Sequence, residues 1–211
     1  MNDPREELLN IYDAAGAIVD ARPRREAKRS GLAVGAVNVL LVNALGQTLL
    51  QRRPPDRENG GRWDKSVGGH VSAGETFDTT AVREAGEELF EDAHSPFVRL
   101  VASAEAFPEA LVGADLTHTV VFRQFSFQRN LRDVRYAPEG GFRNVLYHVA
   151  IYLGRTDIPL SSFHPQASEV EDLRYFPAAE VDQMLLSGGL APNMAFLWLT
   201  HAADLLALVR P

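Results

Sequence analysis

Three glutamates stand close together after a pair of glycines, in the segment GGHVSAGETFDTTAVREAGEELFED from Gly68 to Asp92. On a helix, Glu84, Glu87 and Glu88 are spaced i, i+3 and i+4 and therefore share one face. Like charges at this spacing repel, and a hard divalent cation such as Mg²⁺, which takes oxygen ligands, would remove the repulsion. The segment therefore indicates either a cation site or a solvated, glutamate-rich helix face.

The spacing of apolar residues predicts that this segment is a helix. They recur every four positions, at Phe77, Ala81, Ala85 and Leu89. This apolar stripe lies beside the carboxylate face and not on it. Arg83 stands four residues before Glu87 and can steady it through a charge pair.

The composition favours a soluble cytoplasmic protein. The chain has 211 residues, of which 45% are hydrophobic, and a net charge of −7. An acidic chain gains nothing from bulk attraction to nucleic acid or to an anionic membrane, so we expect neither as a partner. No apolar stretch is long enough to span a membrane. The absence of cysteine excludes disulfides and thiolate chemistry and suits a reducing compartment.

The remaining patterns predict one α+β domain, residues 1–211, with a mixed sheet. Residues 1–30 read as an N-terminal hairpin extension and residues 190–211 as a C-terminal helix whose apolar side covers the core or a second copy in a homodimer. A buried central strand is expected over residues 32–43. Further strands are expected at 47–53, 98–107, 117–127, 144–153 and 172–176, and a helix at 177–189.

The carboxylate segment resembles the Nudix box, G-x5-E-x7-R-E-U-x-E-E-x-G-U, in which U is aliphatic. The matching residues are Gly69, Glu75, Arg83, Glu84, Glu87 and Glu88. The resemblance implies the α/β/α sandwich of that family, with the box at residues 69–91. Two positions depart from the pattern: Phe90 stands where the family has glycine, and Glu91 stands at the final U.

The flanking sequence resembles the isopentenyl-diphosphate-isomerase-like branch of the family. The matching pieces include IYDAAGAIVDARPRREAKRSGL and GRWDKSVGGHVSAGE, whereas residues 128–143 find no counterpart and read as an insertion. The isomerase nucleophile, a cysteine, falls at Gly68, and the two histidines that precede the isomerase metal site are missing. We therefore expect no isomerase activity.

The resemblance implies a hydrolase that cleaves a diphosphate linkage in a nucleoside diphosphate-X or related small molecule. Metal ligands carried over from the family are Glu84, Glu87 and Glu88, holding Mg²⁺ or Mn²⁺. The general base is Glu87, Glu88 or a carboxylate of a later loop, where Glu169 and Glu171 stand; these alternatives stay open. A catalytically weak Nudix domain that binds a ligand or regulates a partner is the alternative function, motivated by the two departures from the box.

Two arginines at a strand end are candidates for binding the substrate phosphates. A guanidinium suits phosphate oxygens, and Arg52 and Arg53 lead toward the box. Alternation along a strand points them to opposite faces, so one of the two is expected to face the site. Gly69 is a candidate for close approach of the substrate, and Arg83 for support of the catalytic glutamates.

The departures from the box predict a longer helix. Glycine ends the family helix because it takes the left-handed conformation cheaply, whereas Phe90 would be strained there. We therefore expect Phe90 to stay helical and the helix to continue to about Asp92 or Ala93. Glu91 would then lie at the edge of the carboxylate face, as a fourth ligand or as a solvated side chain.

Overall fold

A single long strand stands at the centre of the molecule. The computed structural model describes residues 7–209, and in it all ten residues of β3 (Ala33–Val42) are buried. Alternate side chains of β3 enter two different apolar clusters: Val34 and Leu40 join one, and Val37 and Val39 join the other. A strand buried on both faces reads as a continuous apolar run, which explains the composition of this segment.

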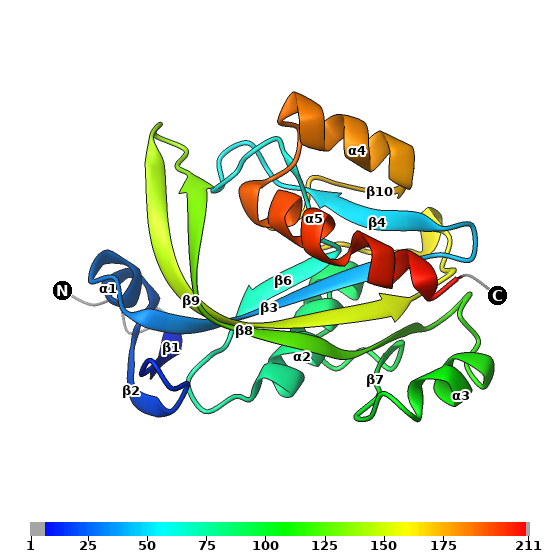
Figure 1. Ribbon diagram of the computed structural model, residues 1–211, viewed down its shortest axis with the longest axis horizontal. Helices are drawn as coiled ribbons and strands as arrows, with labels where there is room; N and C mark the ends of the chain where they lie inside the picture. The colour runs from blue at the N-terminus through cyan, green and yellow to red at the C-terminus, as the bar shows by residue number, and fades with distance from the viewer. Residues whose placement is uncertain (1–6, 210–211) are drawn as a thin grey trace.

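The sheet is mixed and strongly curled (Figure 1). Its main path is β10-β4-β3-β9-β8-β7, in which β3–β9 and β7–β8 are parallel and the other neighbours antiparallel. The strands are β1 (Leu8–Tyr12), β2 (Ile18–Pro23), β3, β4 (Gln47–Arg52), β5 (Trp63–Asp64), β6 (Val67–His70), β7 (Val98–Leu100), β8 (Val120–Tyr136), β9 (Phe142–Arg155) and β10 (Asp172–Pro177).

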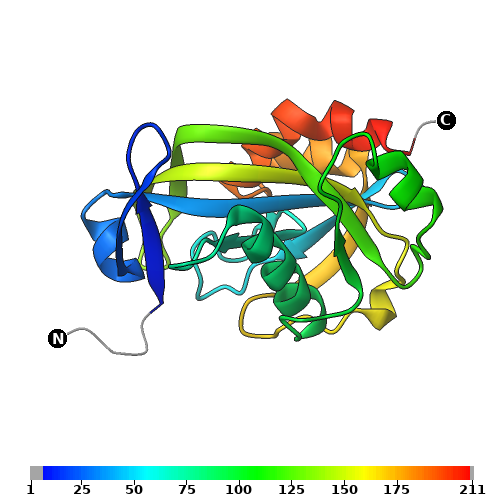
Figure 2. The same ribbon diagram turned by 90° about the horizontal axis from the view of Figure 1, so that it is seen from below.

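Helices cover the two faces of the sheet. They are α1 (Arg24–Arg29), α2 (Phe77–Phe90), α3 (Phe107–Val112), α4 (Ala178–Ser187) and α5 (Pro192–Ala207), with a short 3₁₀ turn at Leu160–Ser162. Figure 2 shows α2 on one face and α4 and α5 on the other. This arrangement confirms the predicted α/β/α sandwich with a mixed sheet. Within residues 7–209, no helix is long and apolar enough to cross a membrane.

The first and the last elements of the described residues both contact the same sheet. The predicted N-terminal hairpin consists of β1 and β2, and β1 also pairs with β3. The C-terminal helix, α5, buries Met194, Leu197 and Trp198 against the sheet. It therefore covers the core. The outer ends of these two predicted segments, residues 1–6 and 210–211, lie outside the described residues.

The segment predicted as an insertion is a hairpin arm. Strands β8 and β9 continue past the sheet and are joined by a turn at residues 137–141, so residues 128–143 form the end of a long antiparallel pair. The register shifts between Gln128 and Leu131, where Asn130 has a φ of 54°. A bulge of this kind bends a strand, and in Figure 1 the arm rises away from the sheet.

The strand predicted at residues 98–107 is wrong beyond its first three residues. β7 ends at Leu100, and α3 begins at Phe107 with Pro108 in its first turn. Proline in the first turn of a helix costs no hydrogen bond, because the amides there have no partner within the helix. Within a strand it would remove one of the hydrogen bonds to the neighbouring strand. The short helix buries Phe107 and Ala110 in a third apolar cluster.

The carboxylate helix ends at the position at which the family has glycine. Phe90 is its last residue, as helical as predicted, and it packs near Phe97 and Phe163. The predicted continuation to Asp92 or Ala93 is wrong, because Glu91 takes the left-handed conformation with a φ of 54°.

The reason for this early end lies inside the helix, at Gly86. The Asp92 amide donates to the Gly86 carbonyl, and the returning chain comes so close that a Cβ on Gly86 would lie 2.2 Å from the Asp92 carbonyl oxygen. The glycine that shapes this helix end therefore stands four residues before the family position. Its missing side chain, not its φ, allows the turn.

Candidate active site

The two adjacent glycines of β6 each leave space for the side chain of another residue that lines the site. A Cβ on Gly69 would lie 2.0 Å from the Glu84 carboxyl carbon, and a Cβ on Gly68 would lie 2.0 Å from Cε of Lys65. Neither glycine has a positive φ. The requirement is space, because strand β6 lies directly against α2 and any side chain there would displace the two functional groups.

Glu88 is held in a buried, fixed orientation. Its side chain is 4% exposed, and Oε2 accepts hydrogen bonds from the Gly68 amide at 2.9 Å and from the Gln51 side-chain amide at 3.1 Å. Burial, followed by repulsion from Glu84, raises the pKa of Glu88 to about 8. Both donors use Oε2, so Oε1 is the oxygen that can be presented to a ligand.

Arg83 links the other carboxylates of the box. Its guanidinium donates to Glu75 at 2.8 Å and to Glu87 at 2.8 Å and lies 3.1 Å from a Glu84 oxygen. Burial, with a contribution from Glu87, raises the pKa of Glu84 to about 7 although Arg83 opposes the shift. One guanidinium therefore orients three carboxylates without neutralising them all.

A cleft of about 260 Å³ joins these carboxylates to several cations. Of the predicted site residues, it is lined by Gly69, Arg83, Glu84, Glu87, Glu88 and Arg53. The cleft also has lining residues that the sequence did not reveal: Arg24, Lys65, His70, Arg135 and Gln166. His70 stands within the box, beside Gly69, whereas the other four come from other parts of the chain, and no local spacing in the sequence connects those four with the box.

The two strand-end arginines point to different surroundings, as alternation requires. Arg53 lines the cleft and donates from Nε to the Glu58 carbonyl at 3.0 Å. Arg52 lies outside it and contacts Glu171 at 3.4 Å. The predicted catalytic residue Glu171 accordingly lies outside the cleft lining, whereas Glu169 lies within it and pairs with Arg57 at 2.9 Å.

The model of the NUDIX domain family matches residues 32–195 of this chain. This range covers the box, strands β3 to β10 and helices α2 to α4. The chain belongs to the Nudix family.

Individual relatives agree with this assignment. An uncharacterized Nudix hydrolase, orf19, of Rhodococcus erythropolis is 35% identical over 89 residues, which cover 41% of this chain and 48% of the relative. An isopentenyl-diphosphate Delta-isomerase of Paenarthrobacter aurescens is 31% identical over 90 residues, 42% of this chain and 49% of that protein. This Nudix chain thus matches about half the length of these relatives. The crystal structure of DR0079 from Deinococcus radiodurans shares the fold, with a TM-score of 0.59 and 18% identity over 97% of this chain and all of the other.

Nudix hydrolases generally use divalent metals, and the donors in this cleft fit one. Burial, followed by repulsion between carboxylates, raises the pKa of Glu84 and of Glu88, and a hard cation with oxygen ligands would relieve that repulsion. Within residues 7–209, no three acidic or histidine side chains converge tightly enough to hold an ion as they stand. Glu87 is turned toward Arg83, so it must leave that contact to become the third ligand.

Proposed function

We propose that this Nudix domain is a divalent-metal-dependent pyrophosphohydrolase that cleaves a diphosphate linkage in a nucleoside diphosphate-X or related small molecule. One observation supports this most strongly. The cleft sets carboxylates suited to Mg²⁺ or Mn²⁺, at Glu84 and Glu88, opposite cations suited to phosphate, at Arg53 and Lys65. A diphosphate bridged by a metal needs both kinds of group within one small space.

Each part of the cleft has a defined task in this proposal. Glu84, Glu88 and a released Glu87 would hold the cation, which supplies Lewis acidity, screens the diphosphate charge and makes water a stronger nucleophile near neutral pH. Arg53 and Lys65 bind the phosphate oxygens and stabilise the charge that develops on the departing phosphate.

The reaction transfers one phosphoryl group to water. The water oxygen forms a bond to phosphorus, the bridging P–O bond breaks, and its electron pair stays on the leaving phosphate. The water proton passes to a carboxylate. Glu87 and Glu88 remain candidates for this base, and Glu169 takes the place of Glu171 as the loop candidate because it lines the cleft.

A panel of diphosphate compounds tests the function directly. Purified protein is incubated with nucleotide sugars, dinucleotides and nucleoside triphosphates, with Mg²⁺, with Mn²⁺ or with a chelator, and release of phosphate-containing products is measured. We expect hydrolysis that requires added metal. A folded protein that hydrolyses none of these compounds in either metal would overturn the proposal and favour a ligand-binding Nudix domain.

The same panel should include isopentenyl diphosphate. The nucleophile position of the isomerases is Gly68, the chain has no cysteine, and the space beside Gly68 is filled by Lys65. We therefore expect no dimethylallyl diphosphate, and its formation by pure protein would contradict the hydrolase assignment.

A further inference from the structure

A second hollow of about 400 Å³ opens beside the catalytic cleft and shares lining residues with it. We call it the basic chamber; the shared residues are Arg24, Arg53 and Glu169. Its volume falls within the range of small-molecule sites, about 300–1,000 Å³. A ligand anchored in the cleft can therefore extend past these shared residues into the chamber.

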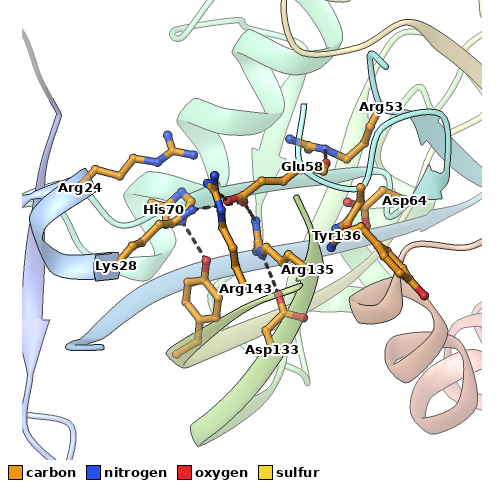
Figure 3. A network of polar contacts seen from close by, with 12 residues as sticks. Arg24, Lys28, Arg53, Glu58, Asp64, His70, Asp133, Arg135, Tyr136 and Arg143 are labelled. Carbon is orange, nitrogen blue, oxygen red and sulfur yellow. Dashed lines mark hydrogen bonds and ion pairs between the residues drawn. The ribbon is translucent and has the colours of Figure 1, made fainter. Parts of the chain in front are cut away.

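Three segments far apart in the sequence build the chamber. Helix α1 contributes Lys28, the loop after β4 contributes Arg57 and Glu58, and the β8–β9 arm contributes Arg143. On the arm, Arg135 and Arg143 are direct cross-strand partners and so project from the same face. Figure 3 shows Lys28, Arg135 and Arg143 gathered around Glu58.

Glu58 lies at the centre of this cluster and contacts three cationic side chains. Its carboxylate lies 3.4 Å from Lys28, 3.3 Å from Arg135 and 3.2 Å from Arg143. One oxygen serves Arg143 and the other serves Lys28 and Arg135. Both oxygens are therefore engaged; Arg135 also pairs with Asp133 at 2.9 Å, and Arg143 also pairs with Glu139.

The whole lining carries a surplus of positive charge. Six cationic side chains and three carboxylates line the chamber, on a chain whose net charge is −7. Burial, followed by repulsion from Arg135 and Arg24, lowers the pKa of Lys28 to about 7, and Glu58 offsets this only in part. Burial and the neighbouring cations together therefore disfavour the charged form of Lys28.

Two further ion pairs lie at the rim of the chamber, and in each of them an anionic ligand can replace the carboxylate. Arg24 pairs with Glu7 at 3.1 Å and Arg57 with Glu169 at 2.9 Å, and all four side chains are about one-third or more exposed. Exposed pairs of this kind contribute little to stability, so a phosphate can replace the carboxylate partner at small cost. Guanidinium groups bind phosphate with two parallel hydrogen bonds.

We propose that the basic chamber is a second anion subsite, which takes a phosphomonoester or comparable dianionic group on the part of the substrate that is not hydrolysed. The substrate of the proposed hydrolase is then a diphosphate with a further phosphate at some distance from the scissile bond. That specificity depends on the proposed function, whereas the affinity of the chamber for phosphate does not.

A matched pair of arginines on the arm tests the specificity. Arg143 lines the chamber, whereas Arg132 is exposed and, three residues from Arg135, projects from the opposite face of the arm. Hydrolysis is compared for a nucleoside diphosphate sugar and for the same compound carrying a phosphate ester on its ribose.

We expect wild-type protein to prefer the phosphorylated compound. Arg143→Met should raise KM for that compound about tenfold, the factor for one charge-assisted hydrogen bond, and leave the unphosphorylated compound unchanged. Arg132→Met should change neither. Equal effects of Arg143→Met on both compounds, or no preference in the wild type, would overturn the specificity.

A binding measurement separates the chamber from the hydrolase. Inorganic phosphate is titrated into metal-free protein by calorimetry, in chelator and with melting temperatures recorded to show that each variant is folded. Saturable binding should weaken about tenfold in Arg143→Met and stay unchanged in Arg132→Met. Phosphate binding without any hydrolysis would refute the proposed hydrolase function but support the chamber as an anion subsite. Hydrolysis together with a phosphate affinity that Arg143→Met does not change would refute the anion subsite but support the hydrolase function.

Discussion

Glu88 and Glu58 are glutamates in adjoining hollows, and their surroundings shift their acidity in opposite directions. Burial and Glu84 raise the pKa of Glu88 to about 8. At Glu58, burial also acts to raise the pKa, but Lys28 and Arg135 overcome it and bring the pKa to about 2. Burial alone therefore does not decide the charge of a carboxylate in this protein; the sign of its neighbours does.

The contrast shows what each hollow lacks. Beside α2, Arg83 contacts three carboxylates, those of Glu75, Glu84 and Glu87, so negative charge outweighs positive charge around this guanidinium. Around Glu58, three cations contact one carboxylate, and the chamber lining as a whole holds six cationic side chains and three carboxylates. In the proposed function and the further inference, a divalent cation would complete the first and an anion would complete the second. A substrate that brings both metal-bound diphosphate and a distal phosphate would satisfy the two together.

The largest effect is expected from Glu88→Gln. The amide keeps the shape of the side chain but loses the charge that holds a metal, so turnover should fall at least about 100-fold. Initial rates with saturating Mg²⁺ and a circular dichroism spectrum measure loss of activity in a folded protein. Glu91→Gln is the matched control on the exposed helix end, and undiminished activity of Glu88→Gln would remove Glu88 from the site.

The same substitution should stabilise the metal-free protein at pH 8. The folded pKa of Glu88 is raised from 4.5, so the stability it contributes is fully present below pH 4.5 and is lost as the pH rises through about 8. Urea unfolding in chelator at pH 8 should show a higher midpoint for Glu88→Gln than for wild type. A lower midpoint would mean that Glu88 is not strained by its neighbours.

Glu58→Gln should act in the opposite way and destabilise the fold by about 3 kcal/mol at pH 7, because it leaves three cations without their shared partner. The folded pKa of Glu58 is lowered, so its contribution is present above pH 4.5 and is lost as the pH falls toward about 2. Urea unfolding at pH 7 and at pH 3 measures this difference, which should shrink at the lower pH. Added phosphate should partly restore the midpoint of the variant if the chamber binds anions.

Gly69→Ala should cost about tenfold to 100-fold in activity with a smaller change in stability. Its Cβ would overlap the Glu84 carboxyl group, and the displacement acts on a ligand instead of removing it. The metal concentration giving half-maximal rate should rise. Gly113→Ala is the control, since the nearest atom to its Cβ would be 3.4 Å away and its φ is not positive; equal behaviour of the two variants would contradict the packing argument.

The smallest effect is expected from Glu91→Gly. Glu91 has a φ of 54°, which a residue with a side chain adopts at a cost of about 1 kcal/mol and glycine adopts freely. The variant should therefore unfold at a slightly higher urea concentration and keep its activity and metal dependence. A loss of metal affinity would instead identify Glu91 as a fourth ligand.

The local sequence was sufficient to predict the positions of the elements that have strong periodic patterns. The apolar run of β3, the apolar stripe of α2 and the proline-to-glycine span of α4 all lie where predicted. The errors fall where a local pattern competes with packing. Residues 101–107 do not continue β7, and α2 stops at Phe90 because Gly86 admits the returning chain.

The sequence by itself determined the carboxylate face of the site. Glu84, Glu87 and Glu88 lie on one turn of one helix, so their spacing fixes their common direction without help from the rest of the chain. The opposite directions of Arg52 and Arg53 likewise follow from alternation at the end of β4, whose last residue is Arg52. Such relations depend only on backbone geometry within an element, and that geometry is the same in every helix and every strand.

Only the tertiary structure decided which cations face those carboxylates. Arg24, Lys65 and Arg135 come from a short helix, a loop and a hairpin arm, and no interval in the sequence relates them to α2. It also decided that Glu169 and not Glu171 lines the cleft, and that Glu58 gathers Lys28, Arg135 and Arg143. These groups meet because the sheet curls and the arm bends at Asn130, and their pKa values depend on distances that only the folded chain sets.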